Sequence, residues 1–210
     1  LIKMNNYKKN KKILENSFNY NEEMEHDACG VGLIASTNGK KSRKIVELGI
    51  QALKAIWHRG AVDADGKSGD GAGIQIEIAP DFFKKKILAT GHSPDDDKRI
   101  CVGMIFLPRT DYSKQEKCRE IIEAALLEEN YNIYGWRQVP INPSVLGKTA
   151  DMNRPEIAQV MFKKNTNLET NDLERDLFET RKKIEKVARE SQLDELYICS
   201  FSSRSIVYKG

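Results

Sequence analysis

Residues 27–35 read Asp-Ala-Cys-Gly-Val-Gly-Leu-Ile-Ala, a cysteine followed at once by small and apolar residues. The run from Gly30 to Ser36 has no helical period, so it predicts a buried strand that begins just after Cys29. Glycines at positions 30 and 32 let the backbone lie close to a substrate. Cys29 is therefore a candidate nucleophile, although a structural cysteine buried at the start of a strand fits the same stretch.

A cysteine attacks effectively only as a thiolate, so Cys29 needs a base near its sulfur. His26 lies three residues earlier and would not point reliably at that sulfur. Cleavage between Ala28 and Cys29 would instead give Cys29 a free α-amino group, with an ordinary pKa near about 8. This amine could accept the thiol proton and return it to a leaving amine, so the bond between Ala28 and Cys29 is the predicted cleavage site.

Residues 1–28 differ in composition from the rest of the chain. Their first half is basic, their second half is acidic, and apolar residues are few, which predicts a disordered leader. The segment lacks the apolar core of a secretory signal, and its acidic half argues against an organellar transit peptide. It is either a removable propeptide or a chain end without function.

The composition of the 210-residue chain, 40% hydrophobic and 31% charged, is ordinary for a globular protein with a sizeable core. The net charge of +3 is too small to indicate nucleic acid as a partner, and no apolar run is long enough to span a membrane. The four cysteines are widely spaced and predict neither a metal site nor a disulfide framework. Reduced thiols of this kind fit a cytoplasmic protein, in which Cys101, Cys118 and Cys199 are small buried hydrophobic residues.

Hydrophobic periodicity predicts both helices and strands beyond residue 40. The predicted helices cover residues 43–57, 80–88, 113–129 and 171–190, and Gly60 ends the first of them. The predicted strands cover residues 72–78, 100–107, 131–139, 156–163, 197–202 and 204–208. The pairs Ser113/Glu116 and Asn171/Glu174 have the spacing of helix caps, and residues 61–71 and 140–155 are predicted to be irregular. The pattern fits a layered α+β or α/β fold.

Two segments carry residues suited to substrate binding. Arg59 can form a bidentate pair with a carboxylate, or complement the end of the helix before it. Residues 68–73, Ser-Gly-Asp-Gly-Ala-Gly, can bring backbone N–H groups close to a ligand, but they match no phosphate-binding fingerprint. Within them Asp70 and Gly71 are the candidate substrate contacts, where Asp70 would receive an ammonium group or simply cap the turn.

Six blocks in order carry a family resemblance: 27–32, 58–61, 69–74, 102–108, 135–140 and 197–210. Together they resemble the class II glutamine amidotransferase domain at the amino end of the large subunit of glutamate synthases. The resemblance covers residues 24–210, and residues 1–28 are similar to the short propeptide of that family. Residues 29–210 would then be the N-terminal part of the amidotransferase domain.

The resemblance implies an α+β fold of the N-terminal-nucleophile hydrolase type, a four-layer αββα sandwich that is incomplete at the C-terminus. It implies that Cys29 attacks the side-chain amide of glutamine, that a glutamyl thioester and ammonia form, and that Arg59 holds the α-carboxylate. The ammonia would serve the reductive amination of 2-oxoglutarate to glutamate in synthase domains that this sequence lacks. Those domains, and not this segment, would hold FMN and an iron–sulfur cluster, with NADPH or ferredoxin as electron donor and a small reductase subunit as a further partner.

One element of the family pattern is missing from these residues. The family forms its oxyanion hole with an Asn-Gly pair, whereas Asn38-Gly39 lies in a turn just after the first predicted strand. We therefore expect the oxyanion donors beyond Gly210 and an inactive polypeptide when the segment stands alone. Two alternatives remain: another class II amidotransferase that sends ammonia to a different acceptor, or a non-catalytic module of the same fold in which Cys29 stays internal.

Overall fold

The structure is a computed structural model that describes residues 9, 12–13, 30–56, 60–95 and 99–209. The chain divides into two compact units, residues 1–31 and 32–210. In the first unit, the described residues Lys9, Lys12 and Ile13 have helical backbone and are exposed. The rest of the predicted leader lies outside the described residues, and every element named below belongs to the second unit.

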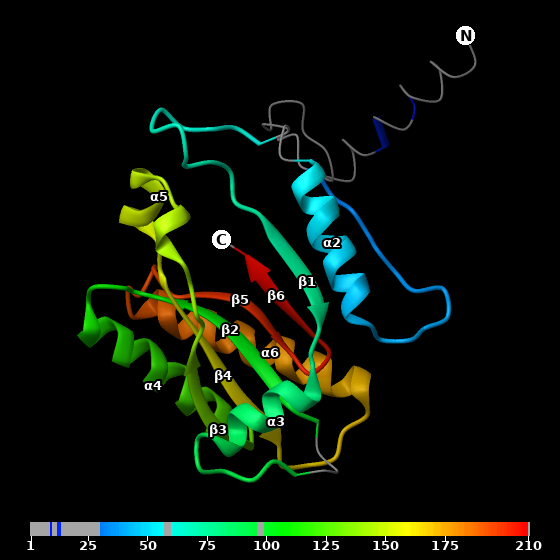
Figure 1. The fold of residues 1–210 in the computed structure, drawn as a ribbon. Coiled ribbons are helices and arrows are strands. Elements are labelled where there is room, and N and C mark those ends of the chain that lie inside the picture. Colours follow the sequence, from blue (N-terminus) through cyan, green and yellow to red (C-terminus); the bar gives the residue numbers. More distant parts are fainter. Residues whose placement is uncertain (1–8, 10–11, 14–29, 57–59, 96–98, 210) are drawn as a thin grey trace. The chain divides into compact units, whose positions relative to one another are not determined.

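Helices and strands of the second unit follow one another along the chain (Figure 1). Their order is α2 (Arg43–Ala55), β1 (Gly73–Glu77), α3 (Pro80–Leu88), β2 (Cys101–Leu107), α4 (Tyr112–Glu128), β3 (Tyr131–Gln138), the 3-10 helix η2 (Pro143–Val145), α5 (Lys148–Asn153), β4 (Glu156–Lys164), α6 (Thr170–Glu190), β5 (Tyr197–Ser202) and β6 (Ser205–Lys209). All six predicted strands beyond residue 40 are therefore confirmed, as are the four predicted helices, within a few residues at their ends.

The strands form two antiparallel sheets. One has four strands in the order β3-β4-β2-β5, and the other is the pair β1-β6. Strands β5 and β6 are adjacent in sequence and meet at a tight polar turn, as predicted, yet they belong to different sheets. Because all pairings are antiparallel, the fold is of the α+β type, and the parallel α/β alternative is excluded for the described residues.

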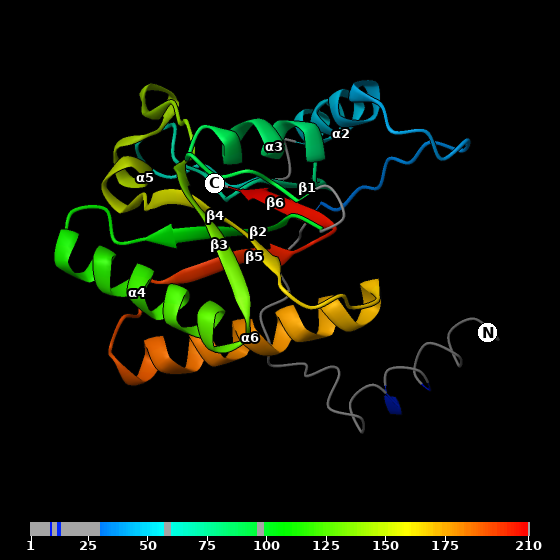
Figure 2. The ribbon, with the colours of Figure 1, turned by 90° about the horizontal axis from the view of Figure 1, so that it is seen from below.

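Both faces of the four-stranded sheet are covered. Strand β2 shows this most clearly, because alternate residues point to opposite faces of a strand and nearly all of its side chains are buried. Cys101, Ile105 and Leu107 pack in one core with α4 and α6. Val102 and Met104 pack in a second core with α3 and β6. Figure 2 shows α4 and α6 on one side of the sheet and α3 with the β1-β6 pair on the other.

The strand predicted over Gly30–Ser36 is wrong. These residues have no regular structure, and Val31 and Leu33 are 93% and 90% exposed. An apolar run becomes a strand only where a neighbouring strand pairs with its backbone groups. In the described part of the chain β1 pairs only with β6, and no strand pairs with residues 30–36.

Three predicted helix ends also need correction. Helix α2 has Ile56 as its C-cap, so Gly60 does not end it. Asp111, rather than Ser113, caps α4 by accepting a hydrogen bond from the Lys114 N–H. At α6 the N-cap is Glu169, which forms no side-chain cap, and the Glu174 carboxylate contacts the β5-β6 turn instead. Local spacing gives several equivalent capping choices, and tertiary contacts decide between them.

The segment 140–155, predicted to be irregular, contains η2 and the six-residue helix α5. Such a helix is too short to be stable by itself. Its N-cap is Gly147, which has no side chain to offer, so α5 needs partners from elsewhere in the chain.

Gly103 lies where β2 is packed most closely, and we expect Gly103→Ala to destabilise the sheet. A Cβ atom there would lie 2.8 Å from Val160 Cγ1 and 2.9 Å from Phe201 Cδ2, both in the core. Overpacking of this kind costs roughly 1–3 kcal/mol of unfolding free energy. Hydrogen–deuterium exchange of peptides that cover β2 and β4 should become faster. Gly32→Ala, whose Cβ would meet no atom within 4 Å, should leave that exchange unchanged; equal effects of the two variants would contradict the packing argument.

Candidate active site

The structure describes only part of the predicted site. Ala28, Cys29 and Arg59 lie outside the described residues, so their predicted roles are untested by the geometry. Asp70 and Gly71 are described, and both lie in the segment from Gly60 to Gly73, called here the glycine-rich loop. The predicted irregular structure of residues 61–71 is confirmed, since they hold turns and one isolated bridge between Val62 and Gly69.

The glycine-rich loop folds back on itself. The Asp63 N–H donates to the Ser68 carbonyl at 2.7 Å, and the Gly66 N–H donates to the Asp63 carbonyl at 2.9 Å. Gly66 has φ +71°, a left-handed conformation that glycine adopts without strain. At Gly69 a Cβ atom would lie 2.8 Å from the Ala61 carbonyl oxygen. The tight return of the loop therefore depends on glycine at these two positions.

Asp70 closes the base of this loop. Its Oδ2 accepts a hydrogen bond from the Ala61 N–H at 2.9 Å, while its own N–H donates to the Ala61 carbonyl at 3.3 Å. The carboxylate thus acts as the turn cap that was one of its two predicted roles. Gly71 follows directly, and β1 begins two residues later at Gly73.

The tip of the loop contacts α5 through two side chains that we did not single out from the sequence, Asp65 and Ser68. Asp65 Oδ2 accepts from the Thr149 N–H at 3.2 Å, and Ser68 Oγ accepts from the Ala150 N–H at 3.0 Å. These two bonds supply the cap that Gly147 cannot give to α5. The teal loop and α5 lie side by side in Figure 1. We call this set of bonds the loop–α5 contact.

Gly147 permits the loop–α5 contact by its lack of a side chain. A Cβ atom there would lie 2.3 Å from both Asp65 Oδ2 and Ser68 Oγ, closer than any real contact. Ser68 is only 6% exposed, so its hydroxyl is shielded from water. The spacing Asp-x-x-Ser was a visible signal of local capping, but it does not say which helix is capped.

The Asp65 carboxylate is ionised in the folded protein. The Ser68 hydroxyl donates to Oδ2, and the N–H groups of Ser68 and Lys67 donate to Oδ1, which together hold its pKa well below the usual 3.8. A lowered pKa means that the contribution to folding is present above pH 3.8 and is lost only as the pH falls further. The loop–α5 contact is therefore insensitive to pH near neutrality.

The described cysteines are poorly suited to nucleophilic attack. Cys101 and Cys118 are fully buried. Burial raises the pKa of Cys118 to about 11 and raises the pKa values of Cys101 and Cys199 as well. The prediction that Cys101 and Cys118 are small buried hydrophobic residues is confirmed, whereas Cys199 is only partly buried.

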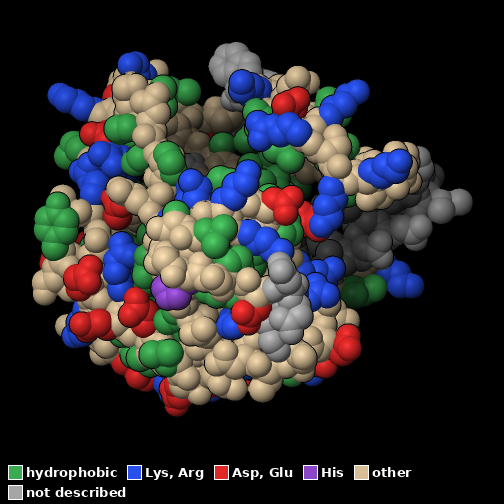
Figure 3. Space-filling view, turned by 60° about the horizontal axis from the view of Figure 1, so that its bottom comes forward, with side chains coloured by type: hydrophobic (Ala, Val, Ile, Leu, Met, Phe, Trp, Pro, Cys, Tyr) green, Lys and Arg blue, Asp and Glu red, His purple; other side chains and the backbone are tan. Residues whose placement is uncertain are grey.

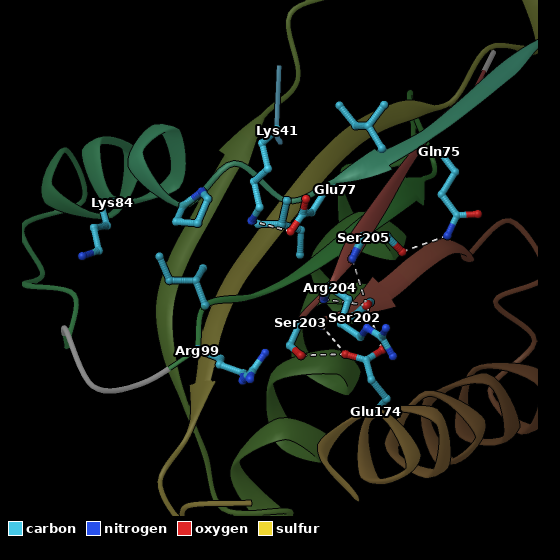
Figure 4. A pocket seen from close by; sticks show the side chains of 14 residues that line it. Lys41, Gln75, Glu77, Lys84, Arg99, Glu174, Ser202, Ser203, Arg204 and Ser205 are labelled. Carbon is cyan, nitrogen blue, oxygen red and sulfur yellow. Dashed lines mark hydrogen bonds and ion pairs between the residues drawn. The ribbon is translucent and has the colours of Figure 1, made fainter. Parts of the chain in front are cut away.

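A cavity of about 870 Å³ lies at the other end of β1 from Asp70. Figure 4 shows how its side chains lie: Glu174 of α6 holds the β5-β6 turn by accepting from the Ser203 N–H at 2.8 Å and from the Ser202 hydroxyl at 2.8 Å. Lys41 and Glu77, which both line it, form an ion pair at 2.5 Å. Of the predicted site residues that the structure describes, neither Asp70 nor Gly71 lines this cavity. In Figure 3 basic, acidic and hydrophobic side chains lie interspersed on the face shown.

The described residues show neither a membrane-spanning helix nor a grouped set of metal ligands. No helix in the described ranges combines the length and apolar character that crossing a membrane requires. Among the same residues, no three His, Cys, Asp or Glu side chains are grouped so that they could hold a metal ion.

Comparison with known families gives a match over most of the sequence. The model of the family described as "Glutamine amidotransferases class-II" matches residues 29–210. The chain belongs to the class II glutamine amidotransferases. The match starts at Cys29, the residue predicted to be the nucleophile.

Individual relatives of this amidotransferase chain are glutamate synthases. It is 52% identical over 191 residues to the "Glutamate synthase [NADPH] large chain" of Azospirillum brasilense, covering 91% of this chain. It is 46% identical to the "Ferredoxin-dependent glutamate synthase" of Pyropia yezoensis, covering 90% of this chain, and 42% identical to "Ferredoxin-dependent glutamate synthase 1, chloroplastic/mitochondrial" of Arabidopsis thaliana, covering 89%. The chain spans about 12% of the length of each of these relatives.

The raised pKa values predict which thiols of the amidotransferase react. With its pKa raised from 9.0 to about 11, Cys118 carries roughly 100-fold less thiolate near neutral pH than a free cysteine. We expect iodoacetamide, applied to the native protein near neutral pH, to leave Cys101 and Cys118 unmodified while Cys29 is alkylated. Peptide mass spectrometry measures this, and labelling in denaturant, where all four should react, is the control. Labelling of Cys118 as fast as Cys29 in the native protein would contradict the assignment.

Proposed function

We propose that this chain is the glutaminase part of a glutamate synthase and that Cys29, freed by cleavage after Ala28, is its nucleophile. The observation that carries the proposal is the family match over residues 29–210, which begins at Cys29. Relatives named glutamate synthases, aligned over about nine-tenths of the chain, favour this over an amidotransferase that serves another acceptor. The raised pKa values of the other three cysteines also support Cys29 as the reactive thiol.

The proposed reaction uses one residue as nucleophile and base. The free α-amino group of Cys29 accepts the thiol proton, and the thiolate attacks the side-chain amide carbon of glutamine. The C–N bond breaks as the amine returns the proton to the leaving nitrogen, so ammonia leaves and a glutamyl thioester remains. Water then attacks the thioester with the amine again as base, which releases glutamate and restores the thiol.

Substrate binding is assigned to Arg59, Asp70 and Gly71. The guanidinium of Arg59 would pair with the glutamine α-carboxylate in bidentate fashion. Asp70 would receive the α-ammonium group. Its Oδ2 is already engaged with the Ala61 N–H, so the proposal assigns the ammonium to the carboxylate as a whole, with the turn held at the same time. Gly71 would allow the backbone to approach the substrate.

The proposed function also implies a particular layered fold and a removable leader. We assign the chain to the N-terminal-nucleophile hydrolase fold with four αββα layers; helices on both sides of two antiparallel sheets are consistent with it. Residues 1–28 would be the propeptide and residues 29–210 the amidotransferase part, in the cytoplasm, where thiols stay reduced. Its ammonia would pass to synthase domains of the same polypeptide, with a small reductase subunit as a further partner.

FMN, an iron–sulfur cluster and the electron donor, NADPH or ferredoxin, would act in those synthase domains. No step that we assign to this chain runs through these groups. What this chain contributes is a nucleophile, a proton carrier and a binding loop for an amino acid.

We expect Cys29→Ser in the full-length enzyme to lower glutamine-dependent glutamate formation by roughly a thousand-fold or more, because a serine hydroxyl ionises far less readily than the thiol and is a much weaker nucleophile. Ammonia-dependent glutamate formation should survive, since it bypasses the thioester. Steady-state assays with glutamine and with ammonium measure the two activities. Cys199→Ser, which removes a thiol that the mechanism does not use, is the matched control and should retain both.

The same enzyme tests the amine as base. Intact mass and N-terminal sequencing should find a mature chain that begins at Cys29. A fully active enzyme that retains residues 1–28 would refute the role of the amine, and glutamine-dependent activity in Cys29→Ser would place the nucleophile elsewhere.

We expect Arg59→Lys to raise the glutamine KM by roughly 10- to 100-fold, because a lysine cannot reproduce a bidentate bond to a carboxylate. The control is Arg43→Lys, which changes an exposed arginine of α2 that pairs only with Glu47 in the described contacts. Steady-state kinetics with varied glutamine measures both variants, and an unchanged KM in Arg59→Lys would exclude the carboxylate role.

A further inference from the structure

We infer that Asp65 and Ser68, through the loop–α5 contact, are positioning residues for the glutamine-binding end of the glycine-rich loop; the inference rests on the proposed function. Neither residue would touch the substrate. Their role would be to fix the place of Asp70 and Gly71, which follow Ser68 by two and three residues.

The loop is held at two ends, and Asp70 lies between them. On one side Gly73 opens β1 and pairs with Lys209, so close that a Cβ atom on Gly73 would lie 2.9 Å from the Lys209 Cβ. On the other side Asp65 and Ser68 bond to the N–H groups of Thr149 and Ala150. Without the second anchor, the described restraints on Asp70 would be its two bonds to Ala61, which lies in the same loop, and the pairing of β1.

Helix α5 is itself joined by ion pairs to segments at the ends of β2 and β4. Asp151 of α5 accepts from Arg154 Nε at 2.6 Å and lies 3.9 Å from a guanidinium nitrogen of Arg109, just after β2. Arg154 leads directly into β4, which begins at Glu156. The loop–α5 contact therefore connects the loop to the connections at the ends of two central strands of the four-stranded sheet.

The two carboxylate oxygens of Asp65 accept hydrogen bonds from different parts of the chain. In the described part of the chain, Oδ1 accepts from the loop alone, from the N–H groups of Lys67 at 2.9 Å and Ser68 at 2.6 Å. Oδ2 accepts from the Ser68 hydroxyl at 2.6 Å and from the Thr149 N–H at 3.2 Å, which lies outside the loop. An asparagine can keep the Oδ1 bonds, but its amide nitrogen would then face the Thr149 N–H, donor against donor. Asp65→Asn thus removes the Asp65 bond of the loop–α5 contact, leaves the Ser68 hydroxyl as acceptor for the Ala150 N–H, and preserves the local turn.

The first test is Asp65→Asn in the full-length enzyme, with Asp63→Asn as matched control. Asp63 lies in the same loop, and among the described residues its carboxylate accepts only from the Ala64 N–H, so the control makes the same charge change without touching α5. We expect the glutamine KM of Asp65→Asn to rise on the order of tenfold with kcat nearly unchanged, and ammonia-dependent activity to stay the same. Asp63→Asn should leave both kinetic constants unchanged.

The second variant is Gly147→Ala, which keeps every hydrogen-bonding group but places a methyl group where Asp65 and Ser68 lie. It should raise the glutamine KM in the same direction. For both variants, hydrogen–deuterium exchange of a peptide over residues 147–153 should be faster, because the Thr149 N–H loses its acceptor in each. In Gly147→Ala the Ala150 N–H also loses its acceptor, so the increase should be larger there.

The outcomes separate this inference from the proposed function. Faster exchange with an unchanged KM, unchanged exchange in Asp65→Asn, or an equal KM rise in Asp63→Asn would each overturn the positioning role. Glutamine-dependent activity that survives Cys29→Ser would overturn the proposed function instead. A KM rise confined to Asp65→Asn and Gly147→Ala, together with faster exchange, supports the positioning role.

Discussion

Strand β2 has to supply hydrophobic side chains to both faces of its sheet, and the rest of the structure depends on this constraint. Both faces are covered, one by α4 and α6 and the other by α3 and the β1-β6 pair, so alternate residues of β2 enter two separate cores. Between its neighbours β4 and β5 the strand is so close to other side chains that Gly103 has no room for a methyl group. Because side chains of β2 also enter the second core, the four-stranded sheet packs directly against the β1-β6 pair. The glycine-rich loop continues into β1 of that pair.

The elements that contact one of these cores could be predicted from the sequence, because their hydrophobic period is set by that contact. Helix α6, with Leu177 and Ile184 on its buried side, and the fully apolar β2 are examples. Elements without such a period could not be predicted. Helix α5 has no buried residue, and its caps come from a loop far away in the sequence. The apolar run Gly30–Ser36 led to the opposite error, a predicted strand that does not form, because hydrophobicity alone does not provide a strand with a partner.

In the candidate site, too, the features that depend on local backbone geometry could be predicted, and those that depend on distant partners could not. Glycine density predicted the loop, and the short polar side chain of Asp70 predicted a turn cap, because both depend on local backbone geometry. Asp65 and Ser68 were missed, since their partners are backbone N–H groups that no sequence pattern marks. The same holds for Glu174, whose spacing suggested a helix cap but whose carboxylate contacts the turn between β5 and β6. Local physical reasoning left the roles of Cys29 and Arg59 open, and their assignment here is a proposal that rests on the family resemblance.

The pairing of β1 with β6 has a consequence for how the protein is made. Gly73 pairs with Lys209 and Glu77 with Ser205. Strand β1 therefore cannot pair with β6 until residues 205–209 have left the ribosome, more than 120 residues after β1 itself. The strands β2, β3 and β4 can pair earlier, because β4 ends at Lys164, and α5 precedes β4. During synthesis the glycine-rich loop would thus be bonded to α5 before β1 has a partner. In a nascent chain halted before β6, the loop would have the attachment to α5 but would lack the one through β1.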